Sequence, residues 1–294
     1  MYTEDGLNED LGSSVFYHYT DSAGLIGILA SESIRMTHIR YLNDEKEFTY
    51  FMEIFNREFQ KSYRQLDKER VDKCTEILDV LKNVKNSTQL YIASFCEDGD
   101  QLSQWRGYAN GSGYSLGFAV KDLIELMGIS YDEVMKAKAS TDVVAPNDNG
   151  IMLRKVIYDP EVVKEKISKL VNLLMELVCN SESSQDEETN FIFEMLSASS
   201  ICKHPSFKEE KEWRLIAIED VHEPYRVKLR SGPRGVVPYI EVPLLSMRDQ
   251  FLLNKIVIGP SQHQQEQKNG IELYMRTNRK QMVNIDVSAS PFRG

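Results

Sequence analysis

One run of residues, Leu90 to Cys96, most constrains the fold of this chain. It reads Leu-Tyr-Ile-Ala-Ser-Phe-Cys, and polar and apolar positions do not alternate along it. A short apolar run of this kind is typical of a strand that is covered on both faces. The sequence therefore predicts a sheet with a buried strand, which needs further strands beside it and helices over it.

Other segments of strand length are spread along the chain. They favour β-branched and aromatic residues, as strands do. The further predicted strands are Val15–Thr20, Ile34–Met36, Tyr114–Val120, Ile151–Tyr158, Glu212–Ile218, Val236–Val242, Lys255–Ile258 and Met282–Val287. Helices are predicted between them, among them Glu161–Cys179, Thr189–Cys202 and Gln262–Arg276, with a solvated acidic loop over Ser181–Glu188.

Short strands separated by helices favour the α+β class, with a central mixed or antiparallel sheet and helical insertions. A chain of 294 residues, 41% of them hydrophobic, is suited to one large core. We predict a disordered N-terminus over residues 1–13 and a single α+β domain over residues 14–294. A helical insertion is expected around residues 159–203.

Composition disfavours several classes of protein. The 35 basic and 45 acidic residues give a net charge of −10, so no general attraction to nucleic acid or to an anionic membrane is expected. A local cationic groove remains compatible with this charge. No apolar run approaches the roughly 18–20 residues that a membrane-spanning helix needs. The four cysteines show no CxxC spacing, which disfavours a zinc cluster and favours reduced thiols in the cytoplasm.

The usual signatures of catalysis are missing from the sequence. It contains no GxxxxGK[ST], GxGxxG, HExxH or GxSxG motif. The five histidines are not paired at metal-ligand spacing, so no metal site is predicted. The glycines of residues 107–114 favour a tight turn, with a phosphate-binding loop as the alternative.

Two polar residues stand where a structural role does not fully account for them. His18 lies among aromatic residues in a predicted strand, as a buried core group or as a ligand contact. Arg40 precedes a predicted helix start, and free N–H groups at such a start bind anions such as a diphosphate. The alternative, that Asp44 caps this helix, explains Asp44 but not Arg40.

The segment around Glu212 is the most informative. Strand alternation predicts that Glu210, Glu212 and Arg214 project from one face. Such charges are costly to bury unless they pair or bind a ligand. Either Arg214 closes an ion pair at the sheet edge, or the carboxylate holds a sugar hydroxyl while positive charge develops on the ring.

An ordered set of motifs resembles a bacterial family. The set comprises Phe16–Thr20, Leu42–Asp44 with Glu47, Ser94–Cys96, Trp105 with Tyr108–Ala109, Gly113–Phe118, and Phe207–Glu210 with Glu212 and Arg214. It resembles the domain-of-unknown-function 2971 family over roughly Phe16 to Ile258. The family name carries no activity.

A more distant resemblance does imply an activity. The strand motif His18–Thr20, the Leu-xx-Ile-Leu core at Leu25–Leu29 and the loop residue Arg40 are similar to the start of ADP-ribosyltransferases of the DNA-modifying toxin type. This resemblance implies a split sheet and NAD as co-substrate. No Ser-Thr-Ser follows the Tyr114 strand, which is a departure from the pattern of that superfamily.

The same resemblance implies roles for single residues. Glu212 and Arg40 would be the catalytic residues, with Glu212 as the carboxylate and Arg40 at the diphosphate. It further implies that His18 and Thr20 contact a ribose of NAD, and that Tyr114 or Ser115 lines the nicotinamide pocket. Tyr41 or Tyr114 would stack on an aromatic ring of NAD, and Arg214 would contribute to NAD binding beside Glu212.

The expected function is an NAD-dependent ADP-ribosyltransferase, acting as a toxin or phage-defence effector on nucleic acid or protein. An antitoxin or regulatory protein is expected as a partner, and no binding to a membrane is expected. If the acceptor is a nucleobase, Trp105 and Tyr108 supply stacking, unless they pack in the core. The alternatives are an NAD glycohydrolase and a non-catalytic nucleotide-sensing or interaction domain.

Overall fold

The computed structural model describes residues 14–42, 45–64, 66–87, 90–108, 113–126, 151–180, 183–218, 227–232, 235–246 and 248–291. The chain divides into two compact units. The sheet unit comprises Met1–His38, Tyr91–Lys155 and Glu210–Gly294, and the helical unit comprises Ile39–Leu90 and Val156–Glu209. The predicted disordered segment 1–13 and the predicted cap Asp44 lie outside the described residues.

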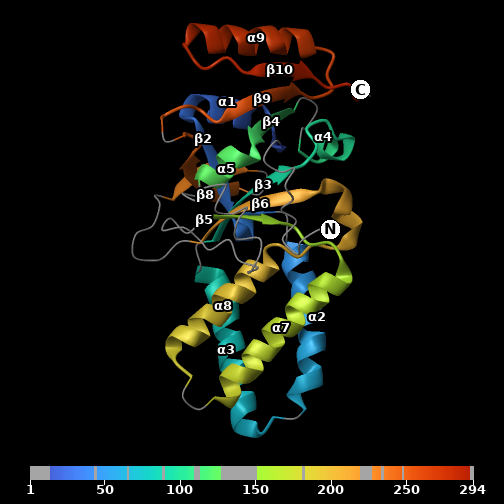
Figure 1. Cartoon of the computed structure of the whole chain (residues 1–294), viewed down its shortest axis with the longest axis vertical. Helices are drawn as coiled ribbons and strands as arrows, with labels where there is room; N and C mark the ends of the chain where they lie inside the picture. Colours follow the sequence, from blue (N-terminus) through green and yellow to red (C-terminus); the bar gives the residue numbers. More distant parts are fainter. Residues whose placement is uncertain are drawn as a thin grey trace. The chain divides into compact units, whose positions relative to one another are not determined.

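The described strands form one ten-stranded sheet (Figure 1). They are β1 (Val15–Thr20), β2 (Ser33–His38), β3 (Leu90–Cys96), β4 (Tyr114–Ala119), β5 (Ile151–Lys155), β6 (Glu212–Ile218), β7 (Lys228–Gly232), β8 (Gly235–Pro243), β9 (Leu253–Ile258) and β10 (Asn284–Val287). The main path runs β10-β9-β4-β1-β3-β2-β8-β7. β9 and β10 pair in parallel, and the pairs along β9-β4-β1-β3-β2-β8-β7 and the pair β5–β6 are antiparallel.

The sheet branches at β3. This strand pairs with β1 at Cys96, with β2 at Tyr91 and Ile92, and also with β6, which carries β5 on its other side. A strand has only two edges, so three partners must share them, and the sheet divides there into two arms. The branch gathers side chains from β1, β3, β5 and β6.

Helices occupy the segments between strands. They are α1 (Ser22–Ser31), α2 (Glu45–Tyr63), α3 (Lys68–Ser87), α4 (Leu102–Tyr108), α5 (Val120–Leu126), α7 (Pro160–Cys179), α8 (Gln185–Ser199) and α9 (Gln264–Thr277), with short 3-10 helices η2 (Ile39–Tyr41) and η3 (Pro205–Glu210). Asp21 caps α1, because its side chain accepts a hydrogen bond of 2.8 Å from the N–H of Gly24. No helix in the described part of the chain is both long and apolar enough to cross a membrane.

The core of the sheet unit lies where α1, α5 and α9 cover the strands. Leu25, Ile28 and Leu29 of α1 belong to it. Strand residues at its centre, each at most 1% exposed, are Ile34, Phe95, Leu116, Phe118, Trp213, Leu215, Ile240 and Ile256. α9 packs against β9 and β10 (Figure 1). Burial of this many apolar side chains is the main stabilising contribution to the unit.

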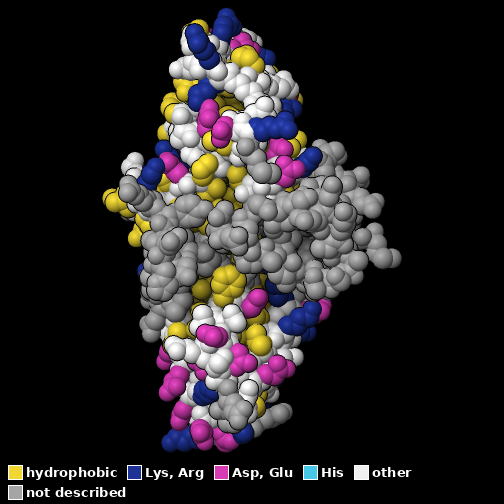
Figure 2. Space-filling view, turned by 60° about the vertical axis from the view of Figure 1, so that its left-hand side comes forward, with side chains coloured by type: hydrophobic (Ala, Val, Ile, Leu, Met, Phe, Trp, Pro, Cys, Tyr) yellow, Lys and Arg dark blue, Asp and Glu magenta, His cyan; other side chains and the backbone are white. Residues whose placement is uncertain are grey.

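The helical unit consists mainly of α2, α3, α7 and α8, which pack against one another. Phe51, Phe55 and Phe59 recur at helical spacing along α2 and are buried, so they form the face of this helix that packs in the core. Ile167 of α7 and Phe191 of α8 are fully buried as well. The outer surface of these helices carries many charged side chains, which Figure 2 shows in magenta and dark blue.

The sequence predicted the coarse fold correctly. The chain is a mixed α/β protein with a large, mostly antiparallel sheet and several helices, and each predicted strand is present with small shifts at its ends. One strand was missed: β7 is short and polar, and it forms only as the partner of β8. The predicted single domain over 14–294 stays a prediction, because compact units can belong to one domain or to two.

The predicted loop Ser181–Glu188 is partly wrong, because α8 begins inside it. The side chain of Ser184 accepts from the N–H of Glu187, and the Glu187 carboxylate accepts from the N–H of Ser184. This capping box, followed by acidic residues near the positive end of the helix dipole, starts the helix at Gln185.

Candidate functional site

Glu212 and Arg214 form a buried ion pair at the start of β6. The Nε of Arg214 donates to Oε1 of Glu212 at 2.8 Å, and Nη2 donates to Oε2 at 3.2 Å. Their side chains are only 5% and 2% exposed. Two parallel hydrogen bonds fix the orientation of both groups, and the removal of either one would leave a buried charge without this partner.

The prediction that Glu210, Glu212 and Arg214 project from one face of a strand is wrong for Glu210. It is the last residue of η3, and β6 begins only at Glu212. Lys211, between them, has a φ of 44°, which lies in the left-handed region that residues other than glycine rarely adopt. This turn interrupts the strand, so alternation relates Glu212 to Arg214 but not to Glu210.

His18 is held in place by the neighbouring strand. Its Nδ1 donates to the carbonyl oxygen of Ser94 at 2.9 Å, and its ring lies 5.8 Å from that of Phe95. Burial lowers the pKa of His18 below its usual value, and the hydrogen bond to Ser94 only partly opposes this shift. The imidazole is therefore neutral near pH 7 and fixed in orientation.

The structure does not bring His18 and Glu212 to one face. Trp213 projects from the face of β6 opposite to Glu212, because successive strand residues alternate. The Trp213 ring packs on Phe16, with ring centroids 4.7 Å apart. Phe16 and His18 share a face of β1, so His18 lies on the side of Trp213 and Glu212 projects from the other side.

A polar cluster does form on the side of His18, and we call Phe16, His18, Glu97, Lys155 and Trp213 the Glu97 cluster. The Oε1 of Glu97 accepts from the Nζ of Lys155 at 2.8 Å and from the Nε1 of Trp213 at 3.0 Å. The Lys155 Nζ also lies 5.4 Å from the centre of the Trp213 ring. The branch at β3 thus places a carboxylate and an amine in contact, on the side of the sheet that carries the neutral imidazole.

Glu97 is ionised near neutral pH. Burial opposes its ionisation, but the hydrogen bonds from Lys155 and Trp213 and the charges of Lys155 and Lys211 outweigh burial and lower its pKa. The side chain remains 32% exposed, and that of Lys155 is 33% exposed. A solute can therefore reach this carboxylate.

The other residues predicted on β1 and β4 are divided between two faces. The antiparallel register pairs Thr20 with Tyr114, and Tyr19 with Ser115. Thr20 and Tyr114 therefore share the face of His18, while Ser115 lies on the other face. Tyr114 is 6% exposed and belongs to the core, and Ser115 is fully buried.

Trp105 is a core residue and not an exposed stacking platform. It is 5% exposed, and its Nε1 donates to Asp100 at 2.8 Å. Its ring meets that of Tyr19 edge to face, with centroids 4.7 Å apart. Tyr108, at the end of α4, is half exposed.

Arg40 and Tyr41 belong to the helical unit, whereas the Glu97 cluster belongs to the sheet unit. Both lie in η2, just before α2 begins at Glu45. Arg40 is exposed, and the Tyr41 side chain is half exposed. Their predicted roles at a diphosphate and a ring stay predictions.

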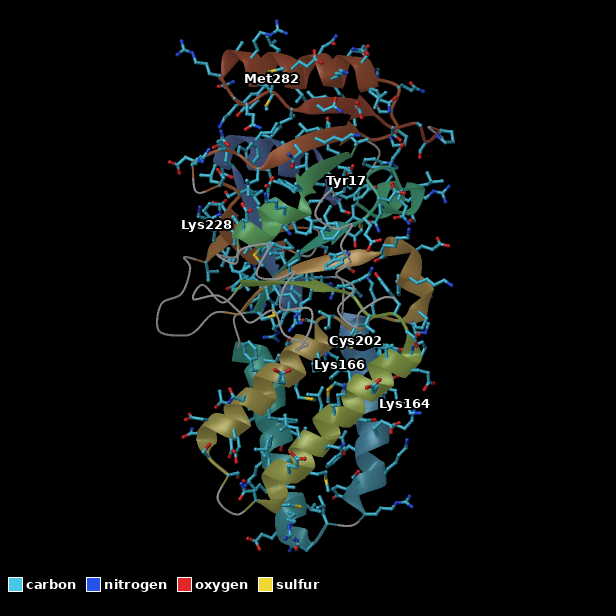
Figure 3. The ribbon with its side chains drawn as sticks, in the orientation of Figure 1. Tyr17, Lys164, Lys166, Cys202, Lys228 and Met282 are labelled. Carbon is cyan, nitrogen blue, oxygen red and sulfur yellow. The ribbon has the colours of Figure 1, made fainter. Side chains whose placement is uncertain are left out.

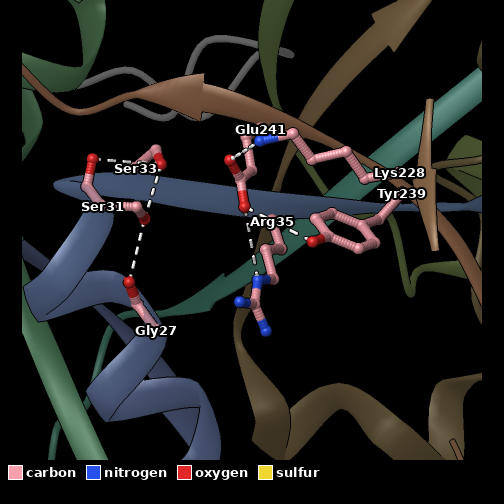
Figure 4. Close-up of polar contacts among 7 residues, drawn as sticks. All are labelled: Gly27, Ser31, Ser33, Arg35, Lys228, Tyr239 and Glu241. Atoms are coloured by element: carbon pink, nitrogen blue, oxygen red, sulfur yellow. Dashed lines mark hydrogen bonds and ion pairs between the residues drawn. The ribbon is translucent and has the colours of Figure 1, made fainter. Parts of the chain in front are cut away.

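A second polar cluster lies on β2, β7 and β8, at the other end of the sheet path from β10. Glu241 on β8 pairs with Arg35 on β2, at 3.7 Å, and with Lys228 on β7, at 2.5 Å (Figure 4). The Arg35 guanidinium also lies 5.2 Å from the centre of the Tyr239 ring. In Figure 3, Lys228 and Tyr17, the neighbour of His18, lie at separate places. We interpret this second cluster as structural, because its ion pairs connect the three strands β2, β7 and β8.

Sequence reasoning missed Glu97 and Lys155. Each lies at or just after a strand end, where charged residues are common, and neither belongs to a motif. Glu97 is 58 positions from Lys155 and 116 positions from Trp213 along the chain. Among the described residues, no group of three or more His, Cys, Asp and Glu side chains could hold a metal ion.

Residues 104–215 match the model of a family described as a protein of unknown function (DUF2971). This match supports the resemblance to that family, over a narrower range than the motifs had suggested. No curated protein and no solved structure matches the chain.

Proposed function

We propose that the chain is an NAD-dependent enzyme of the ADP-ribosyltransferase type, with nucleic acid or protein as acceptor. The observation that carries the proposal is the branch of the sheet at β3, which has three partner strands. A divided antiparallel sheet is what the resemblance to the toxin-type enzymes implies. The resemblance assigns the ribose contact to His18 on the first strand and the catalytic carboxylate to Glu212 on a late strand.

In the proposed reaction, the bond between C1′ of the ribose and the nicotinamide nitrogen breaks, and its electron pair leaves with nicotinamide. Positive charge develops on the ribose, and a nucleophile of the acceptor then bonds to C1′ and loses a proton. A carboxylate fixed beside the ribose stabilises this charge most in the transition state. Glu212 is the predicted carboxylate, and Arg214 holds it in one orientation.

The residues predicted to bind NAD have chemistry that fits a nucleotide. The neutral His18 ring and the Thr20 hydroxyl share one face and can hydrogen-bond to ribose hydroxyls. Arg40, in the helical unit, carries a guanidinium, and its role at the diphosphate stays a prediction of the resemblance. Tyr41 offers a half-exposed aromatic ring for stacking, and Tyr114 or Ser115 remains the predicted contact at the nicotinamide pocket.

A second candidate is a nucleotide-sensing or interaction domain without turnover. The pairing of both Glu212 oxygens with Arg214 favours it, and so does the placement of Glu212 away from the face of His18. A carboxylate engaged in this way is also what a purely structural ion pair would show.

The first prediction concerns NAD turnover. The purified chain should release nicotinamide from NAD, and Glu212→Gln should slow this release about a hundredfold or more if Glu212 stabilises the transition state. Chromatography of nicotinamide measures both rates, and Trp fluorescence checks that the variant folds. Glu53→Gln, at an exposed position of α2, is the matched control.

The outcomes separate the candidates. Absence of nicotinamide release from the wild-type chain would leave only the non-catalytic candidate. Full turnover by Glu212→Gln would remove Glu212 from the reaction. Labelled ADP-ribose on nucleic acid or protein identifies a transferase, whereas free ADP-ribose identifies a glycohydrolase.

A toxin or phage-defence role in the cytoplasm completes the proposal. An enzyme that consumes NAD or modifies nucleic acid harms the cell that makes it. The proposal therefore includes an antitoxin or regulatory partner that controls the enzyme. Expression of the chain should slow growth, and Glu212→Gln should relieve this effect.

A further inference from the structure

One carboxylate of the sheet unit is arranged to bind a hydroxyl group, and it is not Glu212. The Oε1 of Glu97 accepts from both Lys155 and Trp213, at 2.8 and 3.0 Å. No described residue donates a hydrogen bond to its Oε2. The side chain is 32% exposed, so a ligand hydroxyl can approach the second oxygen.

Glu212 differs in both respects. Each of its oxygens accepts a hydrogen bond from Arg214, and its side chain is 5% exposed. A ligand would have to enter a closed, fully paired site to reach it. Glu97 also carries a carboxylate, but hydrogen bonds from the described residues hold only its Oε1, and solvent can reach the side chain.

The charges around Glu97 favour one class of ligand. Lys155 lies against the carboxylate, and Lys211 also acts on Glu97 electrostatically. The ammonium group paired with this carboxylate and the further positive charge of Lys211 disfavour a cationic ligand and attract an anionic one. A ligand with a neutral hydroxyl close to a phosphate satisfies both requirements, and a ribose phosphate has this structure.

The neighbouring strand adds a second polar contact on the same face. Tyr17 of β1 pairs with Cys96 of β3 in antiparallel register, so Phe16 lies opposite Glu97 and His18 lies opposite Phe95. Glu97 and His18 are thus diagonal neighbours, a separation of roughly 7–8 Å in an antiparallel pair. This span is suited to the two hydroxyls and the ring of one ribose.

We propose that Glu97 is the carboxylate that accepts a hydrogen bond from a ribose hydroxyl of a bound nucleotide, while Lys155 and Lys211 attract its phosphate. The choice of NAD as this nucleotide rests on the proposed function. The proposal places this ribose-binding carboxylate on the face of the sheet that carries His18, whereas Glu212 projects from the other face.

The substitution Glu97→Gln tests this assignment. Glutamine keeps a carbonyl oxygen for Lys155 and Trp213, but it replaces the accepting Oε2 by an amide that donates. We expect NAD affinity, measured by titration calorimetry, to fall about tenfold or more, because a hydrogen bond to a charged group is lost. Glu194→Gln, at an exposed position of α8, should bind NAD as the wild type does.

Lys211→Gly provides a second variant that should fold without difficulty. Glycine readily adopts the positive φ that Lys211 has in the structure. We expect its affinity for NAD to fall about threefold, in line with an exposed charge pair. Its affinity for nicotinamide riboside, which lacks a phosphate, should not change.

The outcomes distinguish this inference from the proposed function. If the wild type releases nicotinamide and Glu97→Gln binds and reacts equally well, the inference is wrong and the proposed function stands. If the wild type binds NAD without reaction and Glu97→Gln binds it more weakly, the inference stands and the proposed reaction is wrong. If the wild type does not bind NAD, both are wrong.

Discussion

Two neighbouring ionisable groups at the branch of the sheet have opposite states at neutral pH. His18 is neutral because burial lowers its pKa, and Glu97 is ionised because Lys155 and Trp213 stabilise its charge. Opposite states in adjacent positions give a ligand one neutral and one charged hydrogen-bonding partner. Such pairs of perturbed groups are often found at functional sites, although structural networks produce them too.

The pKa of His18 predicts how stability depends on pH. The unfolded chain takes up a proton near pH 6.5, while the folded chain stays neutral to a lower pH. The free energy of unfolding should therefore fall as the pH drops below about 6.5 and stop falling, for this group, below the folded pKa. His18→Asn keeps an amide donor for Ser94 but does not titrate, so its loss of stability should be smaller.

Urea unfolding of both proteins between about pH 7.5 and pH 5 measures this difference. Equal losses of stability in the wild type and in His18→Asn would show that the folded and unfolded pKa values of His18 are alike.

At the scale of elements, local chemistry decides where helices start. The Ser184 and Glu187 pair begins α8 within a run of acidic residues that otherwise resembles a solvated loop. The Asp21 side chain does the same for α1, and Asp159 accepts from the N–H of Glu161 at the start of α7. Each cap satisfies an N–H that a helix leaves without a partner.

Removal of the α8 cap should destabilise the chain measurably. Ser184→Ala deletes the oxygen that accepts from the N–H of Glu187, and we expect a loss of about 1 kcal/mol in the free energy of unfolding. Ser103→Ala, at an exposed position within α4, is the control and should change stability by less than about 0.5 kcal/mol. A loss in Ser184→Ala no larger than in the control would contradict the capping role.

At the scale of the whole molecule, charge governs association. The net charge is −10 at pH 7, and the isoelectric point is near 5.2. A nucleotide needs only a local cationic patch such as Lys155 and Lys211, so the overall charge does not conflict with the proposed ligand. A nucleic-acid acceptor would need a comparable local surface, because the net field repels it.

The charge balance predicts a solubility minimum near pH 5.2. Repulsion between molecules is weakest where the net charge is zero, so association should be strongest there. Light scattering at low salt from about pH 4 to pH 8 measures this dependence. Scattering that changes in one direction only across this range would contradict it.

The sequence predicted the elements better than the candidate site. Strands such as Leu90–Cys96 and Glu212–Ile218 were predicted because their composition is local information. β7 was missed because its polar residues form a strand only beside β8. Glu97 was missed because its partners are distant in the chain, so no spacing or motif links them.

The sequence by itself determined where strands and helices lie, the charge of the chain and the types of side chain available for chemistry. These properties follow from composition and periodicity over a few residues. Only the tertiary structure decided which side chains share a face of the sheet. Pairing between distant strands set that choice: the register of β1 on β3 brought His18 to Glu97, and alternation along β6 turned Glu212 away.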